Sequence, residues 1–185
     1  MKYVKNFLLA LSILAGVAGC STSGGPSRAE RESALIAAVY DAVDALVGTQ
    51  QLSPVIASGG GVRVLVATVV DLNNLDQSSP FGRLLAEQMS SRLAQMGVSV
   101  SELKLGGKLY VSRSQGELML SREVKEISAS QNADLVLVGT YVEGGSSVYV
   151  TLKLVRASDS AISSAFNFSV PKTGNIGFML LKPVK

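Results

Sequence analysis

The sequence predicts an α/β (α+β) fold: a mixed β-sheet with two helices packed on one face, in the order β-α-β-(β)-α-β-β-β, plus an N-terminal amphipathic helix. Two nearly all-apolar, β-branched runs, residues 63–70 and 135–142, are typical of strands buried on both faces. Helical patterns lie between these runs, and alternation with period two follows the second one. These observations predict buried central strands followed by an antiparallel meander at the C-terminal side.

The chain opens with a predicted lipoprotein signal peptide, residues 1–19. Lys2 and Lys5 precede an apolar run of about a dozen residues, which is too short for a stable transmembrane helix of roughly 20. Four residues at the end of this run resemble the bacterial lipobox: Val17, Ala18, Gly19 and Cys20. We expect cleavage before Cys20, a diacylglyceryl group on its sulfur and acylation of its new amino group.

Cys20 is the only cysteine of the chain, so it has no disulfide partner within it. The alternatives to lipidation are an ordinary cysteine beyond a plain secretory cleavage site and an N-terminal membrane anchor. Lipidation is favoured because a thioether removes a thiol that is a liability in an oxidising compartment. Ser21 stands where aspartate favours inner-membrane retention in many Gram-negative bacteria. We therefore expect a lipid-anchored protein of the outer membrane, on its periplasmic face.

The predicted mature chain is nearly neutral. The whole chain has 17 basic and 14 acidic residues, and Lys2 and Lys5 leave with the signal, so 15 basic residues remain and the net charge is +1. The sequence contains no basic run, and this pattern argues against a nucleic acid partner. No second hydrophobic stretch of spanning length follows the signal, so we expect the lipid to provide the anchor.

The segment before the main domain combines a tether and a helix. Residues 20–27 are the lipidated cysteine and a flexible tether, and residues 28–61 are the N-terminal helix and a Gly/Ser loop. Apolar residues recur at helical spacing from Arg28 to Val47, and Gly48 lies just beyond. This helix either packs on its own domain or is reserved for a partner, and packing is the favoured interpretation.

The main domain is predicted over residues 62–171. A strand at 63–70 and a polar loop lead to Ser79-Pro80, a strong helix start, and Gly97 ends that helix. A further helix is expected at 121–131 and further strands at 98–105, 108–112, 135–142, 148–155 and 161–170. Residues 172–185 are a C-terminal tail, whose apolar segment 178–181 is expected to pair with a sheet edge in this chain or another.

The residue inventory argues against catalysis. The chain has no histidine, the commonest general base and metal ligand, and its one cysteine is lipidated in this interpretation. Asp71, Asn73 and Asp76 resemble the first ligands of a calcium loop. However, no glycine follows them, since the next residue is Gln77, and Gly82 stands at the twelfth position, where that loop needs glutamate. We therefore expect no enzyme activity, no metal and no cofactor beyond the covalent lipid.

Three stretches, residues 64–88, 116–127 and 132–141, resemble the FlgO domain. The first contains the unusual run Asp-Gln-Ser-Ser-Pro-Phe-Gly-Arg at 76–83. The resemblance covers roughly residues 62–171, with the helix at 28–47 and the tail outside it. FlgO proteins are outer-membrane lipoproteins associated with flagellar assembly, basal-body stability and motility. The resemblance implies a small α/β domain, similar to the amino end of TolB and to parts of CsgG, with a non-catalytic assembly role.

The resemblance implies partners but no catalytic residues. The expected partners are the outer membrane, through the lipid, and flagellar basal-body or outer-membrane ring proteins, with a homo-oligomer as a further option. The candidate partner surface consists of Asp71, Asn73, Asp76, Ser78 and Arg83. A purely structural interpretation competes with this one, because Ser79 and Pro80 start a helix and Phe81 suits the core. It leaves only Asp76 and Arg83 for a partner.

Two other functions compete with the flagellar one. A lipoprotein that regulates peptidoglycan synthesis shares this kind of domain but needs a long tether, whereas the tether here is residues 21–27. A component of a CsgG-like secretion assembly needs long amphipathic segments that the sequence lacks. An enzyme is disfavoured by the absence of histidine and of a usable cysteine.

Overall fold

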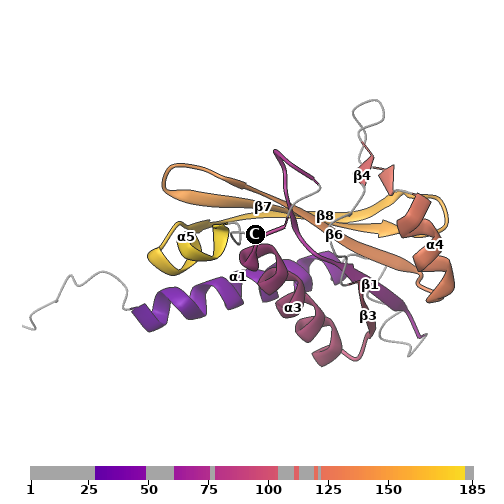
Figure 1. Cartoon of the computed structure of the whole chain (residues 1–185). Helices are drawn as coiled ribbons and strands as arrows, with labels where there is room; N and C mark the ends of the chain where they lie inside the picture. Colours follow the sequence, from indigo (N-terminus) through magenta and orange to yellow (C-terminus); the bar gives the residue numbers. More distant parts are fainter. Residues whose placement is uncertain are drawn as a thin grey trace, which may run out of the picture.

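The computed structural model describes residues 28–48, 61–75, 78–103, 111–112, 119–120 and 122–181 (Figure 1). The predictions for the signal peptide, the lipobox and the tether therefore lie outside the described residues.

A mixed sheet of six strands forms the centre of the domain, in the order β3-β1-β6-β7-β8, with β2 paired to β6. Its strands are β1 (Arg63–Ala67), β2 (Val70–Asp71), β3 (Ser99–Leu103), β6 (Leu135–Glu143), β7 (Ser147–Arg156) and β8 (Ile162–Pro171). β1 is parallel to β3 and β6, whereas β6, β7 and β8 form an antiparallel meander. A separate antiparallel ladder joins β4 (Val111–Ser112) and β5 (Met119–Leu120). The predicted mixed sheet with a C-terminal meander is confirmed.

Four helices accompany the sheet in the described part of the chain: α1 (Arg28–Val47), α3 (Pro80–Gln95), α4 (Arg122–Ser130) and α5 (Gly174–Leu180). α1 has the bounds that the apolar spacing predicts. α3 begins after Ser79 as predicted, and the Ser79 hydroxyl accepts a hydrogen bond from the backbone N–H of Gly82 at 3.3 Å. Within these described helices, none has the length and apolar character needed to cross a membrane.

The two faces of the sheet bury different clusters. Val64 and Val66 of β1 belong to a large core shared with α1, α3 and α5, whereas Leu65 and Ala67 face a smaller cluster on the other side. Ile127 of α4 packs against that smaller cluster. The structure thus corrects the prediction that both main helices share one face. The chain moves from β1 to β3 and then back past β1 to β6, and right-handed crossovers in opposite directions place α3 and α4 on opposite faces.

The N-terminal helix packs on its own domain, as favoured. Its inward side is fully buried in the large core at Val39, Ala42 and Val43. On its border, the Arg92 guanidinium of α3 donates to both carboxylate oxygens of Asp44, at 2.7 and 2.6 Å. This bond lowers the pKa of Asp44 below its usual value. α1 is therefore held by apolar burial and by a two-point ion pair, and it is part of the folded unit.

The C-terminal tail contains a helix where strand pairing was expected. α5 follows Thr173, whose side chain accepts a hydrogen bond from the backbone N–H of Ile176 at 3.4 Å. Ile176 and Leu180, four residues apart, lie on one side of this helix and are both buried in the large core. The prediction of a strand is wrong. On a strand Ile176, Phe178 and Leu180 would all share one face, whereas the helix buries Ile176 and Leu180 and leaves Phe178 exposed.

Candidate functional site

The predicted partner surface lies where the chain leaves the sheet between β2 and α3. β2 pairs with the end of β6, and the backbone N–H of Leu72 donates to the carbonyl of Tyr141 at 2.8 Å. The loop then turns on Asp71, whose carboxylate accepts a hydrogen bond from the backbone N–H of Asn73 at 2.9 Å. The Asp71 carboxylate therefore shapes the loop as well as contributing charge to its surface.

The second half of this loop is tied to the sheet. The Ser78 hydroxyl donates to the carbonyl of Val69 at 2.9 Å. Gly82, in the first turn of α3, lies so close to the same residue that an added Cβ would stand 2.0 Å from the Val69 carbonyl oxygen. Only glycine permits this approach of helix to strand. Ser78 and Gly82 are therefore structural at this position.

Phe81 anchors the start of α3 in the core. Its side chain is 0% exposed and meets the ring of Tyr141 edge to face, with 5.6 Å between ring centroids. Burial raises the pKa of Tyr141, and its hydrogen bond with Ser79 opposes that shift. The core role expected for Phe81 is confirmed, and this end of the sheet is a rigid support for the loop.

The members of the predicted partner surface have different environments. Asn73 and Arg83 are exposed, whereas Asp71 and Ser78 are half-buried and hydrogen-bonded to the loop backbone or the sheet. Asp76 lies outside the described residues, as do Val17, Ala18, Gly19 and Cys20. The structure thus exposes Asn73 just after β2 and Arg83 in the first turn of α3.

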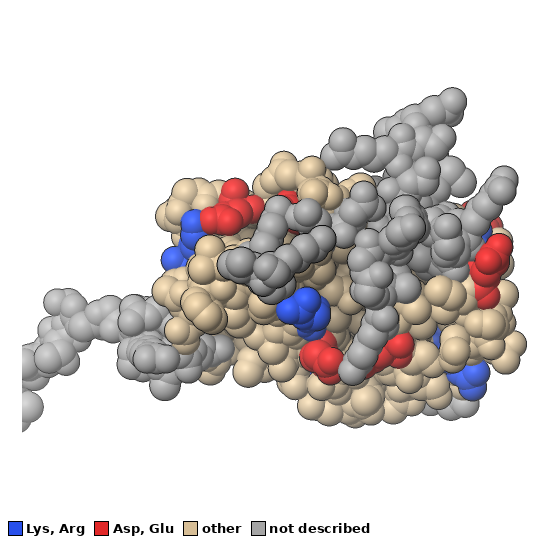
Figure 2. Space-filling model, in the orientation of Figure 1, with Lys and Arg blue, Asp and Glu red and all other residues tan. Residues whose placement is uncertain are grey.

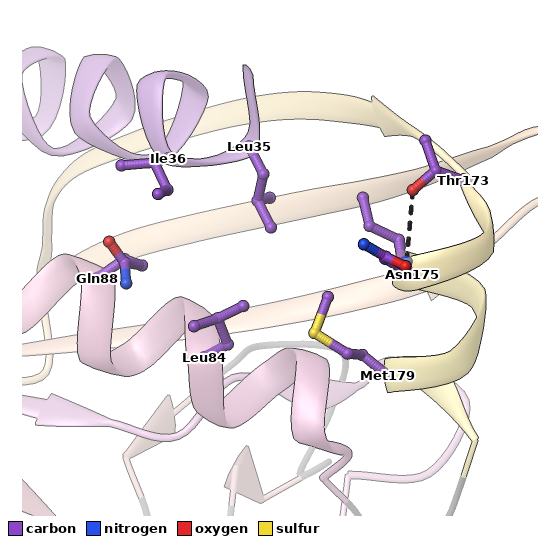
Figure 3. Close-up of a pocket in the computed structure, with 8 residues that line it drawn as sticks. Leu35, Ile36, Leu84, Gln88, Thr173, Asn175 and Met179 are labelled. Carbon is purple, nitrogen blue, oxygen red and sulfur yellow. Dashed lines mark hydrogen bonds between the residues drawn. The ribbon is translucent and has the colours of Figure 1, made fainter. Parts of the chain in front are cut away.

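A pocket that sequence reasoning missed lies between three helices (Figure 3). Its volume is about 210 Å³, and its lining residues are Leu35, Ile36, Leu84, Gln88, Thr173, Asn175, Ile176 and Met179. Leu35 of α1, Leu84 of α3 and Met179 of α5 point toward one another across it (Figure 3). The pocket is therefore mostly apolar and joins helices from both ends of the chain. The spacing of Ile176 and Leu180 does not distinguish a helix from a strand, because residues four apart share a face in both, so the sequence carried no signal for α5 or for this pocket.

Charged side chains do not form a field of one sign on the visible face. Figure 2 shows acidic and basic side chains of the described residues in small mixed groups. Two of the ion pairs are Lys172 with Glu143, and Arg156 with Asp159 at 2.8 Å. Among the described residues, no group of three or more His, Cys, Asp or Glu side chains is placed to hold a metal ion. Several of the described charged side chains are therefore engaged in local pairs of opposite sign.

The fold defines a class of protein: a small α/β domain in which a mixed sheet is flanked by helices and a polar segment joins β2 to α3. The family model described as FlgO protein matches residues 40–175, and the chain belongs to the FlgO family. Membership places it among the lipoproteins of the bacterial cell envelope. The match begins inside α1 and ends inside α5, so it extends beyond the expected limits at both ends. The reason is that both helices pack in the large core of the domain.

Several solved structures are similar to this chain. The LpoB C-terminal domain from Salmonella enterica is 16% identical, with a TM-score of 0.45, and the alignment covers 71% of this chain and 97% of that one. The PelC dodecamer from Paraburkholderia phytofirmans is 18% identical, with a TM-score of 0.43, and the alignment covers 65% of this chain and 80% of that one. Lipoprotein GNA1162 from Neisseria meningitidis is 14% identical, with a TM-score of 0.40, and the alignment covers 62% of this chain and 83% of that one. No curated protein sequence matches the chain.

Proposed function

We propose that this protein is an outer-membrane lipoprotein that supports flagellar assembly, basal-body stability and motility as a non-catalytic interaction module. The observation that carries the proposal is the FlgO family match over residues 40–175. The chain's lack of histidine and its single cysteine, which the lipid occupies in this proposal, support a non-catalytic role. The partners are flagellar basal-body or outer-membrane ring proteins.

The proposed mechanism has two parts, an anchor and a recognition loop. Acyl chains on Cys20 hold the domain at the membrane, and eight residues later α1 begins. Eight extended residues span at most about 28 Å, so the tether keeps the domain close to the bilayer. The β2–α3 loop then presents Asn73, and the first turn of α3 presents Arg83, to a ring protein, while Phe81 and Gly82 hold that turn against the sheet.

The test begins with a clean deletion, assayed by swimming in soft agar and by electron microscopy of basal bodies. We expect poor spreading and missing or unstable flagella, restored by the wild-type gene. Cys20→Ser should abolish labelling with palmitate and fail to restore motility. Arg83→Ala should leave labelling intact and reduce motility. Its matched control is Lys125→Ala on α4, which packs on the other face of the sheet.

The outcomes separate the parts of this proposal. Full motility with intact basal bodies in the deletion strain would contradict the flagellar role and direct the search to regulation of peptidoglycan synthesis or to secretion assembly. Unchanged palmitate labelling of Cys20→Ser would contradict the lipobox. Equal motility of the Arg83→Ala and Lys125→Ala strains would contradict the recognition loop alone.

A further inference from the structure

α5 has one buried side and one strongly exposed apolar side. Ile176 and Leu180 are buried in the large core. Phe178 and Leu181, three residues apart, are 76% and 63% exposed, the highest values among the large apolar side chains that the structure describes. Large apolar side chains with this much exposure are unfavourable in water and suit an apolar partner.

The position of α5 identifies the end of the domain that carries this surface. α5 lines the three-helix pocket together with Leu35 and Ile36 of α1 (Figure 3). Figure 1 shows α5 beside the first half of α1, the half at which the chain enters the domain. From Arg28 to Leu35 the helix rises about 10 Å. The exposed side of α5 therefore lies near the point where the tether meets the domain.

The C-terminal segment is basic in composition. Residues 172–185 contain Lys172, Lys182 and Lys185 and no aspartate or glutamate; Lys172 is paired with Glu143 of β6, and the other two lysines follow α5 in the sequence. Lysines next to exposed phenylalanine and leucine are typical of segments that lie in the interface of a membrane with anionic lipids. The composition of this segment therefore matches a phospholipid surface.

We propose that α5 is a second membrane contact, in which Phe178 and Leu181 enter the interface of an anionic phospholipid leaflet beside the lipid anchor. This inference rests on the lipidation of Cys20 in the proposed function. Two side chains alone bind a membrane weakly, but the short tether makes the contact intramolecular and so raises its occupancy. With α5 on the membrane, the anchored domain has one preferred orientation.

A second copy of the chain is a poorer occupant for this surface. A stable protein–protein interface buries about 800 Å² on each partner, which takes some 20–30 residues a side. The exposed apolar side of α5 offers Phe178 and Leu181. A contact of that size is sufficient at a bilayer interface, because the lipid anchor has already offset the loss of translational and rotational freedom on binding.

The chain contains no tryptophan, which allows a direct test. Phe178→Trp places one fluorescent probe on α5. Ile162→Trp is the matched control, because Ile162 is an exposed apolar residue at the other end of β8 from α5. Nine residue steps of about 3.3 Å separate Ile162 from Pro171, so the control probe lies roughly 30 Å along β8 from the end of the strand that leads to α5. Both are made in the full chain, processed and lipidated in cells, and reconstituted into vesicles.

The vesicles contain phosphatidylethanolamine and phosphatidylglycerol, with and without brominated acyl chains that quench tryptophan on contact. The proposal expects a blue shift and strong quenching for the probe at 178, and neither for the probe at 162. In vesicles of phosphatidylcholine alone, quenching at 178 should weaken. Undiminished quenching there would overturn the role of anionic lipid.

Two results would overturn the membrane contact itself. One is an unquenched probe at 178 in protein that is firmly anchored. The other is a blue shift at 178 without quenching by brominated lipid, accompanied by a doubled mass, which would assign the surface to a second copy. Palmitate labelling of the same sample shows whether the anchor is present. Failure of the second contact is thereby distinguished from failure of lipidation, and motility is scored separately.

Discussion

α3 and α5 both begin with a hydroxyl cap, yet the phenylalanine near the start of α3 is buried and the one in α5 is exposed. In each region a hydroxyl side chain, Ser79 or Thr173, accepts a hydrogen bond from the backbone N–H three residues later. Phe81 then enters the core and is 0% exposed, whereas Phe178 is 76% exposed. Capping thus specifies where a helix begins, and the surrounding packing decides whether its aromatic residue supports the fold or remains available for contact.

The physical difference lies in what covers each helix. The first turn of α3 lies against Val69 and Tyr141, so the Phe81 side chain is covered by the sheet. α5 uses Ile176 and Leu180 for its inward side, which leaves Phe178 on the outside. The first region therefore contributes stability and the second contributes an accessible apolar surface. Four predictions test this contrast.

The largest effect is expected from truncating the two phenylalanines. Phe81→Ala should lower the free energy of unfolding by about 3–5 kcal/mol, because it leaves a cavity and removes the edge-to-face contact with Tyr141. Phe178→Ala should change it by no more than about 0.5 kcal/mol. Urea denaturation of the purified variants measures both values. Similar losses at the two positions would break the comparison.

The next effect comes from adding one methyl group to a glycine in each region. Gly82→Ala should cost about 3 kcal/mol, because its Cβ would stand 2.0 Å from the Val69 carbonyl oxygen and force α3 away from the sheet. Gly174→Ala has nothing within 4 Å of the new atom and should be neutral or stabilising by up to about 1 kcal/mol. Thermal unfolding distinguishes them, and a stable Gly82→Ala variant would refute the close approach.

Removal of the two capping hydroxyls should have a smaller effect. Ser79→Ala should cost about 1–2 kcal/mol, because the cap is buried and also lies beside the Tyr141 hydroxyl. Thr173→Ala should cost about 0.5 kcal/mol, because its 3.4 Å hydrogen bond is only partly buried. Urea denaturation of the two variants measures both losses in the free energy of unfolding. A larger loss at Thr173 would show that α5 contributes more to stability than its contacts indicate.

The smallest effect is expected for Asp44→Asn, which weakens the ion pair between α1 and α3. Both side chains are partly exposed, so water screens the pair and the loss should be smaller than that of the Ser79 variant. Because the pKa of Asp44 is lowered in the folded state, its contribution is complete above the usual value of 3.8 and disappears as the pH falls through the folded value. Denaturation curves of variant and wild type should therefore converge in acid. If the variant remained less stable than the wild type in acid, its loss of stability would come from packing and not from the ion pair.

Much of the fold could be predicted because its signals are local. The apolar runs of β1 and β6, the alternation of β7 and the Ser79-Pro80 helix start each reveal an element without knowledge of its neighbours. The apolar spacing of α1 also predicts its packing side. The candidate site was predictable only as a polar loop, because the hydrogen bond from Ser78 to Val69 joins residues nine positions apart through the fold.

By itself, the sequence determined the kinds of elements, most of their limits, the family resemblance and the absence of histidine, since these depend on neighbouring residues or on composition. Tertiary structure alone decided that α4 lies on the face opposite α3, that the tail forms α5, and that Phe178 is exposed while Phe81 is buried. The physical reason is that periodicity shows which side of an element is apolar, whereas the order of strands in the sheet decides which face each helix covers.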